Sequence, residues 1–385
     1  MRILNKMKIA IFSDTFPPQV NGVANTVFNS ASSLAEKGHI IRVYTVSETC
    51  DEELTRKTDG KFSVFKLPSI GIPSYPGERS SLPLGITLGD VRSFSPDIIH
   101  VHTPFSVGWE GVLCSKKMKI PLIGTHHTFF DHYLKHIHLE YDWAKRLSWK
   151  YTVAFYNKCD LIISPTMSLA NGLRNNKLKK PIEILSNTVD TDTFQPIAGI
   201  SKKGKKVAYM GRVSYEKNID QAIKAISITA KKISDIKFYI IGNGPEKNNL
   251  ENLSKDLKIQ NNVIFTGYLF GNDLNKQLND CDIFLTPSKS ENMPLSVLEA
   301  MSAGLPILAV SSLGMNEIIK NNENGFLLPP DDPQKTAEKI IELIYNEEKI
   351  KKIGKCSREM AMEYSKSKIT DKLVGIYKKT INSKK

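Results

Sequence analysis

Short apolar runs alternate along the chain with longer segments that place apolar residues every three or four positions. The first run, residues 7–14 (MKIAIFSD), precedes a Pro-Pro and Asn-Gly turn, an amphipathic segment at 24–39 and a second apolar run at 40–46. Buried parallel strands have nearly continuous apolar sequences, and helices usually connect them. The pattern therefore predicts the strand, loop, helix, strand unit of a doubly wound parallel sheet.

The same alternation continues through both halves of the chain. In the first half it predicts strands at 97–103, 121–128 and 160–166. After a Pro- and Lys-rich interruption at 175–206 it predicts strands at 206–212, 237–244, 262–268, 282–288, 306–310 and 325–331. We therefore expect two α/β domains, residues 1–190 and 191–364, and a C-terminal helix at about 365–385 that packs back on the first domain.

The loops that follow these strands are where ligand-binding residues are expected. In open parallel sheets the ligand lies beyond the carboxyl ends of the strands, and two such domains facing each other form a cleft. Arg212 and Lys217 follow one strand and suit a diphosphate, with solvated surface cations as the alternative. Gly242 and Gly244 follow another and permit a close approach to a flat ligand. Gly22 begins a predicted helix whose backbone N–H groups suit an anion, or is part of a plain turn.

The segment ENMPLSVLEAMSAGLP at 291–306 brackets a helix with two carboxylates. Pro294 fits the first helical position, where its missing N–H has no partner to lose. Glu291 then lies in the loop before the helix and Glu299 inside it, on different faces, so the two acids are directed at different parts of one ligand. The N–H groups near Leu295 and Ser296 suit a phosphate between them.

All eight histidines lie in the first half of the chain, and five of them fall within residues 125–138. His127 comes at the carboxyl end of a predicted strand, where a reacting group is expected. His132 and His136 are four apart and suggest a metal site as an alternative. No third ligand matches them, and we expect no metal.

Composition narrows the class of protein. The length of 385 residues suits two domains, and a formal charge of +13 favours anionic partners. Five scattered cysteines without a CxxC pair indicate neither a disulfide framework nor a zinc site, so a reducing cytoplasm fits best. No apolar run approaches the roughly 18–20 residues of a membrane span, and no nucleic-acid-binding motif is present.

An ordered set of motifs resembles the retaining glycosyltransferases of family 4, which have the GT-B fold. The set comprises PPQVNGVANTV, THHT, SNTVDTDTF, GRVSYEKN, IIGNGP and the E-x7-E segment with its LEAMSAGLP ending. It runs in order from about Met7 to Asp332. The resemblance implies two Rossmann-like domains facing across a cleft, with an acceptor bound by the first and a sugar-nucleotide donor by the second.

The resemblance also implies roles for individual residues. Glu299 accepts hydrogen bonds from the ribose hydroxyls, and Glu291 from the sugar ring. Arg212 and Lys217 neutralise the leaving diphosphate, to which Gly22 donates a backbone N–H. His127 contacts the donor sugar near the reaction centre. Further donor contacts are implied for the segment Met293, Pro294, Leu295 and Ser296 and for Gly242 and Gly244, and neither a cofactor nor a metal is required.

Two departures from the family pattern concern the donor. Asn292-Met293-Pro294 stands where an aromatic residue and glycine often follow the first Glu, and SNTVD replaces the usual Pro-Asn-Gly-Val-Asp. The first departure leaves the identity of the sugar open.

The acceptor is suggested by the first domain. Its motifs look most like bacterial enzymes that glucosylate diacylglycerol, which implies UDP-glucose as donor, a lipid acceptor, and a peripheral place on the inner face of the membrane. Apolar residues recur every four positions within 135–158, at Leu139, Trp143, Leu147, Tyr151 and Phe155, among Lys and Arg residues. Such a helix binds an anionic membrane or packs on the sheet. The alternatives are a hexosyl- or mannosyltransferase acting on a phosphoinositol lipid or polysaccharide precursor, and a non-catalytic two-domain sugar-binding protein.

Overall fold

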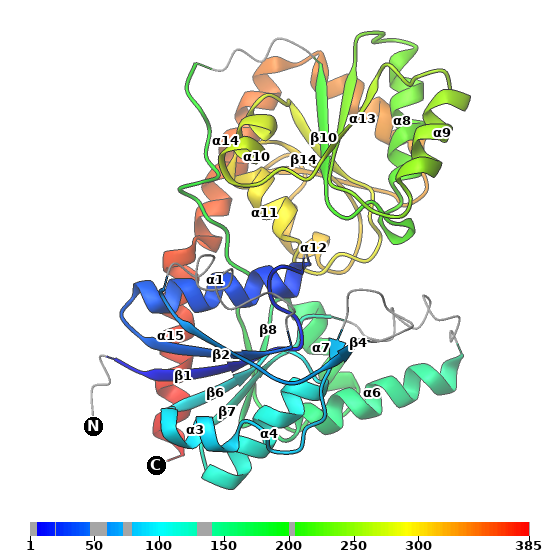
Figure 1. Cartoon of the computed structure of the whole chain (residues 1–385). Helices are drawn as coiled ribbons and strands as arrows, with labels where there is room; N and C mark the ends of the chain where they lie inside the picture. Colours follow the sequence, from blue (N-terminus) through cyan, green and yellow to red (C-terminus); the bar gives the residue numbers. More distant parts are fainter. Residues whose placement is uncertain are drawn as a thin grey trace. The chain divides into compact units, whose positions relative to one another are not determined.

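The computed structural model describes residues 6–19, 21–46, 60–71, 79–128, 141–199 and 205–384. The chain divides into two units, residues 1–188 with 366–385 (unit 1) and residues 189–365 (unit 2). Each unit contains a parallel sheet with helices on both of its faces (Figure 1). The predicted class, two doubly wound α/β domains, is confirmed.

Unit 1 contains a seven-stranded sheet in the order β3-β2-β1-β6-β7-β8-β9, with every neighbouring pair parallel. The strands are β1 (Lys8–Phe12), β2 (Ile40–Thr45), β3 (Ser63–Lys66), β6 (Ile98–Val101), β7 (Leu122–Thr125), β8 (Leu161–Ser164) and β9 (Ile182–Ile184). A short antiparallel pair, β4 (Ile70–Gly71) and β5 (Arg79–Ser80), lies outside this sheet.

Helices cover both faces of the unit 1 sheet. They are α1 (Gly22–Glu36), α3 (Leu88–Phe94), α4 (Ser106–Met118), α6 (Asp142–Tyr156), α7 (Met167–Asn175) and α15 (Lys366–Ser383). Successive side chains of a strand point to opposite faces. In β1, Ile9 and Ile11 pack with α1 and α15, whereas Ala10 and Phe12 pack with α3, α4, α6 and α7. The continuous apolar run of β1 therefore contributes side chains to the hydrophobic cores on both faces of the sheet.

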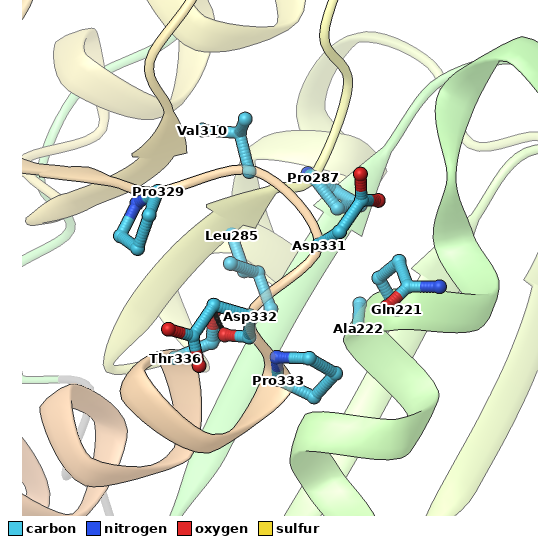
Figure 2. A pocket seen from close by; sticks show the side chains of 10 residues that line it. All are labelled: Gln221, Ala222, Leu285, Pro287, Val310, Pro329, Asp331, Asp332, Pro333 and Thr336. Atoms are coloured by element: carbon cyan, nitrogen blue, oxygen red, sulfur yellow. Dashed lines mark hydrogen bonds between the residues drawn. The ribbon is translucent and has the colours of Figure 1, made fainter.

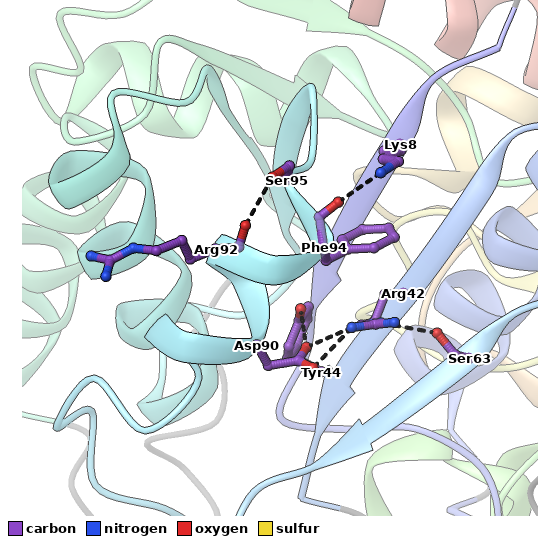
Figure 3. Close-up of polar contacts among 8 residues, drawn as sticks. All are labelled: Lys8, Arg42, Tyr44, Ser63, Asp90, Arg92, Phe94 and Ser95. Atoms are coloured by element: carbon purple, nitrogen blue, oxygen red, sulfur yellow. Dashed lines mark hydrogen bonds and ion pairs between the residues drawn. The ribbon is translucent and has the colours of Figure 1, made fainter.

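An ion pair holds α3 against β2 (Figure 3). Both Asp90 carboxylate oxygens accept hydrogen bonds from Arg42, at 2.9 and 3.0 Å, and Tyr44 donates its hydroxyl to Asp90 at 2.7 Å. The Arg42 guanidinium also lies over the ring of Phe94, 4.6 Å from its centroid. These contacts fix the position of α3 on the sheet.

Unit 2 contains a six-stranded parallel sheet in the order β12-β11-β10-β13-β14-β15. Its strands are β10 (Lys206–Met210), β11 (Lys237–Ile241), β12 (Val263–Gly267), β13 (Ile283–Thr286), β14 (Ile307–Val310) and β15 (Gly325–Leu328). The strand order reverses between β10 and β13. The loops after these two strands leave towards opposite faces of the sheet, which is where ligands bind in folds of this class.

The unit 2 helices also form two layers. They are α8 (Ile219–Ala230), α9 (Lys247–Asp256), α10 (Gly271–Asn279), α11 (Leu295–Ser302), α12 (Met315–Ile318), α13 (Pro333–Ile344) and α14 (Glu347–Ala361), with 3-10 turns η2 (Tyr215–Lys217) and η3 (Met362–Tyr364). One core contains residues of α8, α9 and α13, and the other contains residues of α10, α11 and α12.

The charged tail of the chain is shared between the units. Helices α13 and α14 belong to unit 2, whereas α15 belongs to unit 1 and packs against α1. Leu373, Tyr377 and Ile381 of α15 are buried in the core beneath α1, and Lys37 pairs with Asp371 at 2.7 Å. The last helix therefore completes the first domain.

Candidate active site

Arg212 lies in the loop after β10, and its backbone is held firmly. The flanking N–H groups of Gly211 and Val213 donate to Ile241 and Asn243, both at 3.0 Å, and Tyr209 donates its hydroxyl to the Arg212 carbonyl at 3.1 Å. The Arg212 side chain is exposed and bonds to none of the described residues. A fixed backbone with a free guanidinium is suited to binding an anion from solution.

Gly242 and Gly244 cross this same loop closely. A Cβ at Gly242 would lie 2.0 Å from the carbonyl oxygen of Gly211, and one at Gly244 would lie 2.2 Å from that of Val213. Gly242 also has φ +137°, which favours glycine. The sequence suggested that both glycines make room for a flat ligand. In the structure both glycines make room for the loop that carries Arg212, and their contact with a ligand stays a prediction.

Lys217 and Glu291 form an ion pair. The Lys217 Nζ lies 2.6 Å from Glu291 Oε1, and their side chains are 24% and 15% exposed. Lys217 ends the η2 turn after β10, and Glu291 lies in the loop after β13, so the pair spans the point where the strand order reverses. The sequence had assigned these residues to different parts of one ligand and did not predict that they bond to each other.

Helix α11 begins one residue later than predicted. Pro294 is its N-cap, with an extended ψ of 126°, and its carbonyl accepts hydrogen bonds from Val297 and Leu298. The prediction that Pro294 occupies the first helical position is therefore wrong. No side chain caps the helix, and no described residue accepts from the N–H groups of Leu295 and Ser296. These two donors remain available to an anion.

Glu299 lies inside α11 and is partly buried, and its carboxyl group has no hydrogen bond to any described residue. Burial raises the pKa of its carboxyl to about 8, and the nearby charge of Asp190 adds to this rise. A carboxyl in this environment is stabilised by any ligand that donates hydrogen bonds to its ionised form. Met293, in contrast, has its side chain buried in the hydrophobic core.

Gly314 supports the loop before α11, and the sequence analysis missed it. Its N–H donates to the Glu291 carbonyl at 3.1 Å, and a Cβ there would lie 1.6 Å from the carbonyl oxygen of Asn292. The signal available was the Ser-Ser-Leu-Gly turn that follows the strand predicted at 306–310. Gly314 therefore sets the path of the backbone that carries Glu291.

In unit 1, His127 follows β7 and pairs with a second histidine that the sequence analysis did not single out. Its Nε2 lies 3.0 Å from Nδ1 of His102, which follows the neighbouring strand β6. Burial lowers the pKa of His127 to about 4, so its imidazole is neutral at physiological pH. Gly22 also lies in unit 1 as the first residue of α1, and a Cβ added there would meet no atom within 4 Å.

The metal alternative from the sequence concerns residues whose structure is not described, so it stays untested. His132 and His136 lie outside the described residues. Within those residues no group of three or more His, Cys, Asp or Glu side chains is placed to hold a metal ion.

A small pocket in unit 2 is lined by none of the predicted site residues (Figure 2). It is lined by Gln221, Ala222, Leu285, Pro287, Val310, Pro329, Asp331, Asp332, Pro333 and Thr336. Asp331 pairs with Lys289 at 2.5 Å, and Asp332 caps α13 by accepting from the Lys335 N–H at 2.9 Å. Both carboxylates are thus engaged by the protein itself.

Helix α6 buries one part of the apolar stripe that the sequence predicts at 135–158 and exposes another part. Phe155 is buried against the sheet, whereas Trp143, Leu147 and Tyr151 are 61%, 58% and 42% exposed. Packing on the sheet therefore accounts for only part of the stripe, and residues 135–140 lie outside the described residues. None of the described helices has the length and apolar composition to cross a membrane.

Two family models match the chain, one over each half. "Glycosyltransferase Family 4" matches residues 20–193, and "Glycosyl transferases group 1" matches residues 190–360. Among solved structures, that of Anabaena HepE in complex with UDP has a TM-score of 0.79 at 17% identity, covering 97% of this chain and 100% of its own. The structural likeness concerns the fold.

Relatives with an assigned activity differ in the sugar they use. An alpha-monoglucosyldiacylglycerol synthase of Streptococcus pneumoniae is 28% identical over 341 residues, covering 83% of this chain and 75% of its own. A GDP-mannose-dependent alpha-mannosyltransferase of Corynebacterium glutamicum is also 28% identical, over 360 residues, covering 90% and 83%.

Proposed function

This chain belongs to the family 4 glycosyltransferases of GT-B fold, and from that premise we propose that it transfers glucose from UDP-glucose to a lipid acceptor such as 1,2-diacylglycerol. Unit 2 binds the donor and unit 1 the acceptor. The configuration at the sugar carbon is retained, and no metal takes part. Membership of this enzyme family excludes the non-catalytic sugar-binding protein considered from the sequence.

The exposed, unbonded guanidinium of Arg212 is the observation that carries the proposal. Breaking a glycosyl-phosphate bond leaves negative charge on the diphosphate, and preorganised donors stabilise that charge in the transition state. Arg212 supplies two N–H donors, Lys217 a compact charge, and Leu295 and Ser296 backbone N–H groups. These groups supply the electrostatic role that a divalent cation has in other transferases, which supports metal independence.

The two carboxylates and His127 hold the rest of the donor. Glu299 accepts from the ribose hydroxyls, and Glu291 accepts from the sugar once its bond to Lys217 is exchanged. During transfer the bond from the sugar carbon to the phosphate oxygen breaks and a bond to the acceptor hydroxyl oxygen forms on the same face. The acceptor proton passes to the departing phosphate oxygen. His127, neutral because of burial, adds no charge beside the developing positive charge on the sugar.

A lipid acceptor is supported by helix α6. Trp143 and Leu147 expose large apolar surfaces beside the exposed cations Arg146 and Lys150. Helices of this composition lie in the interface of anionic membranes. We infer that the enzyme acts from the cytoplasm, bound peripherally at the inner face of the membrane, where a diacylglycerol is accessible.

A second candidate is a mannosyltransferase that uses GDP-mannose, with a phosphoinositol lipid or a polysaccharide precursor as acceptor. The mannosyltransferase relative has the same identity as the glucosyltransferase relative and covers more of the chain, which favours keeping this candidate. Asn292 and Met293 beside Glu291 depart from the family pattern at the point where the sugar is recognised.

A matrix of donors and acceptors distinguishes the two candidates. Labelled UDP-glucose, UDP-galactose and GDP-mannose are each incubated with vesicles that contain diacylglycerol, phosphatidylinositol or neither, and lipid extracts are separated by chromatography. We expect label in glucosyldiacylglycerol from UDP-glucose alone. Label from GDP-mannose in phosphatidylinositol would establish the second candidate, and products restricted to water-soluble acceptors would contradict the lipid proposal. The Arg212→Ala variant is the inactive control.

A further inference from the structure

His102 is a buried residue whose side chain makes one hydrogen bond within the described structure, to His127. Its Nδ1 lies 3.0 Å from His127 Nε2, and the two rings are nearly parallel, 17° apart. The other ring nitrogen, Nε2, is buried and has no hydrogen-bond partner. His102 is 3% exposed, which places it behind His127 and out of reach of a substrate.

A second histidine keeps His102 in place. The His100 ring lies with its centroid 4.1 Å from that of His102. Both nitrogens of His100 are engaged, Nδ1 with the Tyr377 hydroxyl at 2.7 Å and Nε2 with the Thr125 hydroxyl at 2.6 Å. His100 therefore cannot turn without breaking two hydrogen bonds, and the His102 ring is confined between it and His127.

The contact determines which nitrogen of His127 is available. Because His127 Nε2 faces His102, the free nitrogen is Nδ1, which bonds to no described residue. Only one proton fits between the two facing nitrogens, so the proton position on one ring sets that on the other. An imidazole held by a neighbour in one orientation and one tautomer is a common requirement for precise contact with a substrate.

We propose that His102 is a positioning residue that orients His127 and fixes its tautomer, so that Nδ1 of His127 is the atom presented to the donor sugar. The inference deepens the proposed function and rests on it for the role of His127. A buried polar side chain that bonds only to a site residue, and leaves its own second nitrogen unpaired, contributes little to the stability of the fold. Its contribution lies in the geometry of the residue it holds.

Two substitutions separate positioning from packing. His102→Phe keeps the ring and removes the nitrogen, whereas His102→Asn places an amide near the position of Nδ1. We expect His102→Phe to lower kcat for hexose transfer about 10-fold, within the range of a lost positioning contact, with less than a two-fold change in donor KM. His102→Asn should recover at least half of the lost rate. Equal losses in both variants, or a wild-type rate in His102→Phe, would overturn the proposal.

Tyr377→Phe is the matched control. It removes one of the two hydrogen bonds of His100, keeps the other bond, to Thr125, and removes no atom of the contact between His102 and His127. We expect wild-type kcat, with thermal unfolding lowered at most slightly. A loss of rate as large as that of His102→Phe would mean that general loosening of the cluster is responsible, and the proposal would fail.

Nitrogen NMR provides a readout that does not depend on transfer. In protein labelled with nitrogen-15 histidine, His127 should show one protonated and one unprotonated ring nitrogen, and in His102→Phe both shifts should move towards the average of two tautomers. Unchanged His127 shifts in that variant would refute the pairing. If no donor supports transfer, the proposed function fails while this spectrum still decides whether His102 fixes the tautomer.

Discussion

Lys217 Nζ bonds to Glu291 Oε1 at 2.6 Å although the two residues are 74 positions apart in the sequence. They meet because β10 and β13, which precede their loops, are neighbours in the sheet. The pair neutralises two charges that are proposed to bind opposite ends of the bond that breaks. We expect a diphosphate bound at Lys217 to compete with Glu291 for this ammonium, and the weakened ion pair to make the Glu291 carboxylate available to the sugar.

Lys217→Met and Glu291→Gln should each lower the free energy of unfolding of unit 2. The double variant should lose less free energy of unfolding than the two single variants lose together. Removing one member of a partly buried pair leaves the other charge without its partner, at a cost of about 1–2 kcal/mol here, where some solvent remains. We expect a coupling free energy of about 1 kcal/mol from a double-mutant cycle in urea. Both single variants should also lose at least about 100-fold in transfer rate.

The control for this cycle is the exposed pair of Lys224 and Asp220 on α8, at 2.9 Å. Lys224→Met should change the free energy of unfolding by less than about 0.5 kcal/mol and leave transfer unchanged. If Lys217→Met lowers the free energy of unfolding no more than Lys224→Met does, the pair of Lys217 and Glu291 has no energetic role.

Arg212 and Arg358 should respond to substitution in opposite ways. Arg358 donates hydrogen bonds to the carbonyls of Phe194, Ser302 and Thr191, at 2.8–3.1 Å, and so ties α14 to α11. Arg358→Met should lower the free energy of unfolding by about 2–3 kcal/mol because charged hydrogen bonds are lost. Arg212→Ala should leave unfolding unchanged and lower kcat about 100-fold or more. A loss of stability in Arg212→Ala would contradict the finding that the Arg212 guanidinium makes no bond to the described residues.

Nucleotide binding should release a proton from Glu299. Burial raises the pKa of this carboxyl to about 8, so it is largely protonated at pH 7 in the free protein. Hydrogen bonds from ribose hydroxyls stabilise the ionised form and lower its pKa. Calorimetry of UDP binding at pH 7 in two buffers of different ionisation enthalpy should therefore show release of a fraction of a proton, and affinity should rise between pH 6 and 9. Glu299→Gln should abolish both effects.

The same group sets a pH dependence of stability. Because the pKa of Glu299 in the folded protein lies above the ordinary glutamate value of 4.5, folding takes up a proton between about pH 4.5 and 8, and this stabilisation is lost as the pH rises through that window. Glu299→Gln, which resembles the protonated form, should therefore be more stable relative to wild type at pH 9 than at pH 5. An identical difference at both pH values would show that Glu299 is already ionised in the folded protein.

Buried histidines should weaken unit 1 in acid. Burial lowers the pKa of His126 to about 3 and that of His127 to about 4, whereas in the unfolded chain both take up protons near pH 6.5. The unfolded state then binds more protons below about pH 6.5, and the free energy of unfolding falls as the pH falls. His126→Phe should flatten the curve measured in urea from pH 7 to 4.5. Parallel curves for wild type and His126→Phe would contradict a contribution of His126 to the pH dependence. Asp14 is buried in both proteins, so its contribution cancels when the two curves are compared.

The fold followed from the sequence because apolar runs mark strands that are buried on both faces, as Ile9 and Phe12 of β1 show. Pairings across the sheet did not follow. The contact of Lys217 with Glu291, and that of His102 with His127, depend on strand order and register, which a single sequence does not specify. The local preference of proline for the first helical position also gave a wrong prediction. The loop before α11 is extended through Pro294, which is therefore the N-cap.

A glycine and an apolar repeat also show that a single sequence does not specify which groups become neighbours in the fold. Gly242 signals a close approach in the sequence, yet only the structure shows that the neighbour is the carbonyl of Gly211. A four-residue apolar period in 135–158 predicted one stripe, but Phe155 faces the sheet and Trp143 faces solvent. Near its end the helix packs on the unit, and near its beginning the helix leaves its aromatic side chains uncovered.

The uncovered side chains of α6 should bind membranes. Trp143 and Leu147 are 61% and 58% exposed, and burying each in lipid contributes about 1.5–3 kcal/mol. Trp143→Ala with Leu147→Ala should therefore lower binding to vesicles of anionic lipid at least about 10-fold in sedimentation, without changing thermal unfolding. Transfer to a detergent-dispersed diacylglycerol should remain. Tyr345→Ala removes an aromatic side chain of similar exposure from unit 2 and should leave vesicle binding unchanged; an equal loss there would show that α6 is not the membrane-binding surface.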